Sequence, residues 1–148
     1  MDNTVLLVED ENKTGKILKK ALESEGISVE WVLGGKSAIS KIQRGKFDLI
    51  ILDLKLPEFT GDQVLEHIRS IDPYVEVIIY TNYQDPPVMK KLINLGVEGY
   101  INKGSEADLW ETVKKIKERL DPFNEKEIQS LTDSVPKGFL HEHHKKEE

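Results

Sequence analysis

Four short apolar segments of the chain are each followed by a side chain that can do chemistry. Glu9 and Asp10 follow the first of these segments, Asp53 follows the second, and Thr81 and Lys103 lie 28 and 50 residues beyond Asp53. Carboxylates that share a site repel one another and raise each other's pKa unless a cation lies among them. Mg²⁺ accepts such oxygen ligands and keeps room for waters and a phosphate oxygen. An aspartate beside a metal, a lysine and a hydroxyl can also act as a nucleophile toward a phosphoryl group.

These residues come together only if the apolar segments are neighbouring strands of one sheet. The segments carry no polar alternation, which is typical of strands buried on both faces of a parallel sheet. In a parallel sheet the carboxyl ends of the strands meet at one edge, where ligands bind. We expect strands at five places: residues 5–8, 29–33, 49–52, 77–80 and 97–101.

Between the expected strands lie segments with the apolar spacing of amphipathic helices. The second helix is expected to end at Gly45, and the third to begin after Thr60 as its N-cap. The fourth would begin at Pro86-Pro87 and end at Gly96, and Ser105 is the expected cap of the fifth. The apolar stripes of the five helices are Ile17, Leu18, Ala21 and Leu22; Ala38, Ile39 and Ile42; Val64, Leu65, Ile68 and Ile71; Val88, Leu92, Ile93 and Leu95; and Leu109, Val113, Ile116 and Leu120.

Five strand-helix units in strict alternation predict an α/β fold with a parallel sheet. For units of this size we expect the flavodoxin-like, three-layer (βα)5 arrangement, with a five-stranded parallel sheet of order 2-1-3-4-5. This domain would occupy residues 1–120. Residues 121–148, with seven acidic and four basic side chains, would form a C-terminal extension: a short helix over 124–132 and then a mobile polar tail.

Composition excludes several classes of protein. The 148 residues carry a net charge of −6, which argues against a nucleic-acid-binding chain, and they include no Cys, which excludes disulfide scaffolds and thiol catalysis. No apolar run is long enough for a membrane span, and the residues after Met1 do not form a signal peptide. We therefore expect a cytoplasmic protein that binds neither membrane nor nucleic acid directly.

In order, the segments resemble the receiver domain of two-component response regulators over residues 3 to 120. Val5-Leu6-Leu7-Val8-Glu9-Asp10-Glu11 is similar to the first strand and acidic pair of that family. Leu52-Asp53-Leu54-Lys55-Leu56-Pro57-Glu58-Phe59-Thr60-Gly61 resembles its phosphoacceptor loop. Thr81, Tyr100 and Lys103 stand where the family has its switch hydroxyl, switch aromatic and invariant lysine.

The resemblance implies a role for each matching residue. Asp53 would accept a phosphoryl group from a phosphohistidine on a histidine kinase or histidine phosphotransfer protein. Asp10, Asp53 and the backbone carbonyl of Lys55 would bind the Mg²⁺ cofactor, with Glu9 acting through water. Lys103 would pair with the phosphoryl oxygens, and Thr81 and Tyr100 would move on phosphorylation. The surface of the fourth helix, fifth strand and fifth helix would then change its preference for a downstream output protein or domain, so the chain is expected to be a switch rather than an enzyme.

Three residues depart from the family pattern. Asn82 replaces a small residue beside the site, which predicts slow loss of the phosphoryl group. Gly104 replaces a proline after Lys103 and predicts a softer loop, because glycine restricts the backbone least. Thr60 replaces an acidic residue and is expected to be a harmless cap.

Other readings of single residues and of the whole chain stay open. Glu9, Asp10 and Glu11 could simply cap the helix that follows them, since acidic residues suit the helix dipole at that end. Trp110 lies off the expected core stripe and is either an exposed anchor for a homodimer or partner, or half-buried packing. Trp31 is expected to pack, and His141, His143 and His144 belong to the polar tail. For the whole chain two alternatives stay open. One is an Mg²⁺-dependent phosphohydrolase with an aspartyl-phosphate intermediate, although such enzymes often carry a second Asp two residues after the nucleophile, where this chain has Lys55. The other is a degenerate receiver that acts only as a docking module.

Overall fold

The sheet has the predicted number and order of strands. A computed structural model describes residues 3–82, 85–103 and 108–121. Its five strands pair in parallel in the order β2-β1-β3-β4-β5, which confirms the flavodoxin-like topology. The strands are β1 (Thr4–Val8), β2 (Ser28–Val32), β3 (Leu49–Leu52), β4 (Glu76–Thr81) and β5 (Gly99–Asn102).

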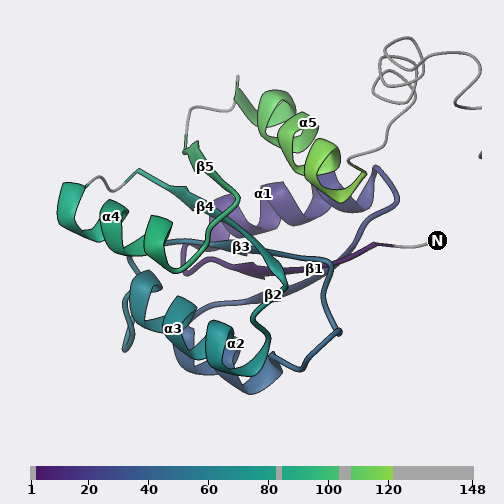
Figure 1. Cartoon of the computed structure of the whole chain (residues 1–148). Helices are drawn as coiled ribbons and strands as arrows, with labels where there is room; N and C mark the ends of the chain where they lie inside the picture. The colour runs from purple at the N-terminus through teal and green to yellow at the C-terminus, as the bar shows by residue number, and fades with distance from the viewer. Residues whose placement is uncertain (1–2, 83–84, 104–107, 122–148) are drawn as a thin grey trace, which may run out of the picture.

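Five helices cover the two faces of this sheet (Figure 1). They are α1 (Asn12–Glu23), α2 (Gly35–Lys41), α3 (Gly61–Ile71), α4 (Pro86–Asn94) and α5 (Leu109–Leu120). Helices α1 and α5 pack on one face, and α2, α3 and α4 pack on the other. The three layers follow from the right-handed crossovers that parallel strands require.

Each face of the sheet has its own apolar core. Leu6, Ile50 and Ile79 point toward α2, α3 and α4, whereas Leu7, Ile51 and Ile78 point toward α1 and α5. Successive side chains of a strand alternate between faces, so a strand buried on both faces must be apolar throughout. This is why β1, β3 and β4 were recognisable from unbroken apolar runs.

Three expectations about the apolar residues were wrong. Ile71 is expected on the buried stripe of α3, but it is the last residue of that helix and is 37% exposed. Leu33 was placed in the second strand, but β2 ends at Val32 and Leu33 is 50% exposed. Ile93 was placed on the buried stripe of α4, yet it is 67% exposed. A helix turns by about 100° per residue, so the residue after the fully buried Leu92 is carried away from the sheet.

Helix starts were predicted more reliably because a cap is a local signal. Thr60 is the N-cap of α3, where its backbone N–H donates to Gln63 Oε1 at 3.0 Å. The proline pair begins α4, with the Asp85 carboxylate accepting from the Val88 N–H as an N-cap. The N-cap of α5 is Asp108 and not the expected Ser105, because the helix begins at Leu109. Gly104 and the expected short helix and tail after residue 121 lie outside the described residues, so those predictions stand untested. No helix in the described ranges is long and apolar enough to cross a membrane.

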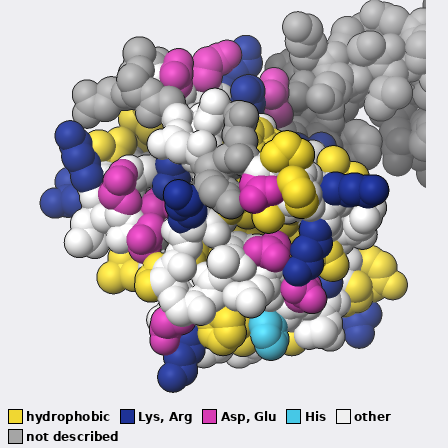
Figure 2. All heavy atoms as spheres, turned by 90° about the vertical axis from the view of Figure 1, so that its left-hand side faces the viewer, with side chains coloured by type: hydrophobic (Ala, Val, Ile, Leu, Met, Phe, Trp, Pro, Cys, Tyr) yellow, Lys and Arg dark blue, Asp and Glu magenta, His cyan; other side chains and the backbone are white. Residues whose placement is uncertain are grey.

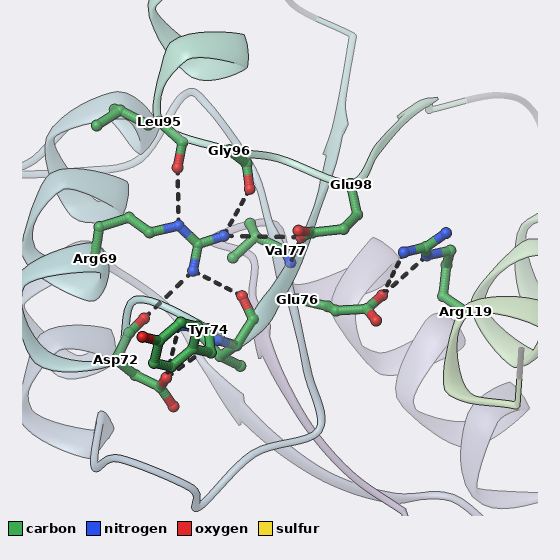
Figure 3. Close-up of polar contacts among 10 residues, drawn as sticks. Arg69, Asp72, Tyr74, Glu76, Val77, Leu95, Gly96, Glu98 and Arg119 are labelled. Atoms are coloured by element: carbon green, nitrogen blue, oxygen red, sulfur yellow. Dashed lines mark hydrogen bonds and ion pairs between the residues drawn. The ribbon is translucent and has the colours of Figure 1, made fainter.

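Arg69 of α3 joins the ends of several elements far from the carboxyl edge of the sheet (Figure 3). Its guanidinium donates to the carbonyls of four residues: Leu95, Gly96, Asp72 and Val75. It also lies 3.7 Å from Glu98 Oε1, an oxygen that accepts the N–H of Val77. One side chain therefore satisfies the carbonyls that follow α4 and those that lead into β4.

Replacing this arginine is expected to destabilise the fold. Arg69→Met should lower the free energy of unfolding by about 2–3 kcal/mol, because several carbonyls, three of them in partly buried bonds, lose a charged donor together. Arg119→Met is the matched control. Arg119 pairs with Glu76 at 2.7 Å on an exposed surface, and such pairs contribute about 0.5 kcal/mol. Urea denaturation of both variants measures the difference, and equal small losses would contradict the role given to Arg69.

Candidate functional site

The side chains singled out in the sequence meet at the carboxyl edge of the sheet. Figure 2 looks onto this edge and shows acidic and basic side chains next to one another. A cavity of about 480 Å³ opens here and is lined by Asp10, Glu11, Asp53, Lys55, Thr81, Asn82 and Lys103. Residues from the ends of β1, β3, β4 and β5 thus share one opening, as the strand order requires.

Asp53 lies at the base of the cavity. It is only 4% exposed, and its N–H extends the ladder by donating to the Val8 carbonyl at 3.1 Å. One carboxylate oxygen, Oδ2, lies 2.8 Å from Lys103 Nζ, and the other faces the Lys55 N–H at 3.4 Å. The backbone after β3 therefore holds the carboxylate in a fixed orientation.

Glu9 is fully buried beside Asp53. Its Oε1 lies 2.6 Å from Lys103 Nζ in an ion pair without the directionality of a hydrogen bond, and its Oε2 accepts the Glu11 N–H at 3.1 Å. Burial raises the pKa of Glu9 to about 7, although Lys103 and the Glu11 N–H favour the charged form. A further cation nearby would therefore stabilise the charged form of the Glu9 carboxylate.

Lys103 provides the positive charge between the two carboxylates. Burial lowers the pKa of its ammonium, but Asp53 and Glu9 outweigh that effect and raise the pKa overall. The backbone N–H of Lys103 donates to the Thr81 carbonyl at 3.1 Å, so the pairing of β5 with β4 continues as far as Lys103. The ammonium also lies 5.7 Å from the centre of the Tyr80 ring. The side chain is therefore directed into the site rather than into solvent.

Asp10 completes an acidic cluster suited to a metal ion. Glu9, Asp10 and Asp53 each offer an oxygen atom, and these atoms all lie within 4.8 Å of one another. Asp10 is exposed, unlike the other two. A set of three carboxylates that all offer oxygen ligands fits a hard cation such as Mg²⁺. The residues present thus fit the metal implied by the sequence.

Thr81 and Tyr100, the two residues that are expected to move on phosphorylation, lie in different surroundings. Thr81 ends β4, is 1% exposed and lines the cavity. Tyr100 of β5 is partly buried and packs against the core on the α2-α3-α4 side, away from the cavity lining. Thr81 therefore belongs to the site, and Tyr100 belongs to the apolar packing beside it.

A second cavity of about 650 Å³ lies beside the first and shares Asp10 and Lys55 with it. Its remaining lining is Leu54, Leu56, Pro57, Thr60, Asp62 and Val88. The lining of this larger cavity does not include Asp53, Thr81 or Lys103, so the candidate site is the smaller cavity.

Sequence reasoning missed how Trp31 contributes to this region. The residue was expected only to pack, and it does pack on the core under α1 and α5. Its indole Nε1 also donates to the Glu9 carbonyl at 2.9 Å. No sequence pattern signals this bond, because it depends on the direction of one side chain across two neighbouring strands.

Trp110 has most of its surface open, with 63% exposed. It borders a groove of about 470 Å³ on α5 together with Val113, Lys117 and Glu25. The exposed ring agrees better with the anchor than with half-buried packing, and an anchor role remains a prediction.

Comparison with known proteins agrees with the geometry. The family model of the response regulator receiver domain matches residues 5–114. The chain is 32% identical over 104 residues to the uncharacterized transcriptional regulatory protein YkoG of Bacillus subtilis (strain 168), covering 70% of this chain and 46% of YkoG. It is 31% identical over 113 residues to the transcriptional regulatory protein PcoR of Escherichia coli, covering 76% of this chain and 49% of PcoR. The chain thus spans less than half the length of these relatives.

Solved structures give the same answer. A CheY-like response regulator receiver domain protein from Methanospirillum hungatei JF-1 is 30% identical with a TM-score of 0.76, over 82% of this chain and 96% of that one. The non-phosphorylated HemR receiver domain from Leptospira biflexa is 27% identical with a TM-score of 0.74, over 80% of this chain and 94% of that one. The chain belongs to the response regulator receiver domain family of two-component signalling.

Proposed function

We propose that the chain accepts a phosphoryl group on Asp53 from a phosphohistidine of a partner protein. The observation that carries the proposal is the position of Lys103, whose ammonium lies within 3 Å of both Glu9 and Asp53 in an open cavity that Thr81 also lines. These contacts support the assignment of Asp53 as nucleophile, Lys103 as charge-neutralising group and Thr81 as hydroxyl donor.

In the transfer step, an oxygen of the Asp53 carboxylate forms a bond to phosphorus while the bond between phosphorus and the donor imidazole nitrogen breaks. The electron pair of that bond stays on the imidazole nitrogen, which can then take up a proton. Lys103 would release the Asp53 oxygen and pair with an oxygen of the transferred group, so no buried charge is left without a partner. The Thr81 hydroxyl would donate to another oxygen of the group.

Asp10, Asp53 and the Lys55 carbonyl would bind Mg²⁺, with Glu9 behind them acting through water. When bound, the metal would neutralise charge on the transferring oxygens. The carboxylate oxygens of Glu9, Asp10 and Asp53, which lie within 4.8 Å of one another, support this assignment.

Phosphorylation would act on the surface formed by α4, β5 and α5 through a shift between two packings. A bond from Thr81 to the phosphoryl group is available in only one packing, and that difference in contacts favours it. Tyr100 would then turn inward toward the space that Thr81 leaves. The partial burial of Tyr100 against α4-side residues supports its role as the moving aromatic.

The partners follow from the chemistry and from the relatives. A histidine kinase or histidine phosphotransfer protein would supply the phosphoryl group, in the cytoplasm where ATP-dependent donors are made. The relatives are named as transcriptional regulators, and this chain matches less than half of them. We infer that the output lies in a protein or domain beyond residues 1–120 and that these residues do not bind DNA. A phosphohydrolase is less well supported, because position 55 holds an exposed lysine and not a second carboxylate.

Phosphorylation of the purified wild-type chain tests the proposal. We expect a labile mass gain of one phosphoryl group on incubation with a small phosphodonor and Mg²⁺, and little or none when the metal is removed by a chelator. Intact-mass spectrometry measures both. Continuous release of phosphate from unrelated phosphate esters would instead favour the phosphohydrolase.

Asn82 is expected to prolong the life of the phosphoryl group. It is exposed at the mouth of the cavity, where its side chain can obstruct the approach of water to Asp53. Asn82→Ala should therefore lose the group severalfold faster than wild type. The decay of the phosphorylated mass after removal of the donor gives both lifetimes, and equal lifetimes would refute the shielding role.

A further inference from the structure

Strand β2 holds the acidic loop after β1 with both a backbone group and a side chain. Trp31 pairs with Leu7 in the ladder between these strands. One residue beyond the end of β1, the Glu9 N–H donates to the Val32 carbonyl at 3.0 Å, and the Glu9 carbonyl accepts from Trp31 Nε1 at 2.9 Å. The indole thus supplies the bond that a further backbone N–H would supply in a longer ladder.

The Trp31 ring is itself confined by α1. A Cβ atom added to Gly15 would lie 2.2 Å from Trp31 Cζ2, so the ring rests against the backbone of this glycine. The Gly15 N–H in turn donates to the Glu11 carbonyl at 2.9 Å. The indole therefore lies between the Glu9 carbonyl and the first turn of α1, and it has little freedom to move away.

The bond to the Glu9 carbonyl constrains the backbone at Asp10. That carbonyl belongs to the peptide that joins Glu9 to Asp10, and because a peptide is planar, fixing its oxygen also fixes the nitrogen of Asp10. Asp10 needs such a constraint more than its neighbours do. It is the exposed member of the acidic cluster, and repulsion from Glu9 and Asp53 would direct it outward into solvent.

We propose that Trp31 is a positioning residue of the acidic site, which holds Asp10 in the orientation that binds Mg²⁺. The inference rests on the proposed function, since it assigns the geometry of the same site. Residues that orient metal ligands influence metal affinity without touching the metal. Removing the indole N–H while keeping an aromatic ring should therefore weaken Mg²⁺ binding more than it weakens the fold.

The variant Trp31→Phe tests this, with Trp110→Phe as the matched control at an exposed tryptophan. Isothermal titration with Mg²⁺ alone should give a dissociation constant about threefold to tenfold higher for Trp31→Phe, the effect of one hydrogen bond. Trp110→Phe should bind Mg²⁺ like wild type. Thermal unfolding without metal shows whether the loss is one of stability, and a merely structural role would lower the melting temperature while leaving the affinity unchanged.

A second measurement needs no folded variant at position 31. The chain has two tryptophans, so its nitrogen-15 NMR spectrum has two indole signals, which Trp110→Phe assigns. Mg²⁺ should shift the Trp31 indole signal in wild type and leave that of Trp110 in place. An unmoved Trp31 signal at saturating Mg²⁺, or equal affinities of wild type and Trp31→Phe, would overturn the inference. A wild-type chain that binds no Mg²⁺ would instead overturn the metal site of the proposed function, and the inference with it.

Discussion

Asp53→Asn is expected to abolish the phosphoryl adduct while leaving the protein folded. The amide oxygen is a far poorer nucleophile than a carboxylate, and the substitution also removes the charge that pairs with Lys103 at 2.8 Å. Since no other group at the base of the cavity has the same contacts, we expect a complete loss within detection rather than a slower reaction. Intact-mass spectrometry after incubation with Mg²⁺ and a small phosphodonor measures it.

Asp62→Asn is the matched control for this variant. Asp62 is a neighbouring carboxylate that lines the larger cavity and pairs with Lys91 at 3.0 Å. It lies outside the set around Lys103, so its replacement should leave the adduct unchanged. An adduct on Asp53→Asn equal to that of wild type would show that the nucleophile has been misassigned.

Gly61→Ala is expected to have the largest effect on stability and to slow phosphorylation as well. Gly61 begins α3, and a Cβ atom there would lie 2.5 Å from the backbone oxygen of Asp53 and 2.6 Å from Leu54 Cα. Both contacts involve backbone atoms, so the strain cannot be relieved by rotating a side chain. We expect a loss of about 2–4 kcal/mol in the free energy of unfolding, as for other overpacked sites. The displaced Asp53 peptide should also reduce the rate of adduct formation.

Gly99→Ala serves as the control for an added methyl group. The nearest atom to a Cβ at Gly99 is Ile78 Cγ1 at 3.7 Å, an ordinary contact. Its effect on unfolding in urea should stay within about 0.5 kcal/mol. If Gly61→Ala were as stable as Gly99→Ala, the close approach of α3 to the phosphoacceptor loop would not be a structural constraint.

The fold was predictable because its signals are local or periodic. Unbroken apolar runs identified β1, β3 and β4, and the N-cap Thr60 and the first-turn proline Pro86 identified the starts of two helices. Errors arose at apolar residues that directly follow a buried residue. Leu33 and Ile93 are apolar but exposed, and only the direction of their side chains relative to the sheet decides this.

The membership of the candidate site was predictable, and its internal pairing was not. Strand order alone brings Asp10, Asp53, Thr81 and Lys103 to one edge. The sequence did not reveal that Glu9 is fully buried and paired with Lys103, because that depends on which carboxylate the ammonium reaches. Trp31 and Arg69 were missed for a related reason. Each donates to backbone carbonyls of residues far away in the sequence, and such bonds leave no spacing pattern.

Chemical localisation of the phosphoryl group tests the central claim most directly. Hydride reduction converts an acyl phosphate on a carboxylate into an alcohol and leaves phosphate esters intact, so fragment-ion sequencing of the reduced protein identifies the modified residue. The account predicts reduction at Asp53 alone, in the peptide that follows β3. Reduction at Glu9 or Asp10, or a phosphate that resists reduction because it is esterified to a hydroxyl such as that of Thr81, would contradict it.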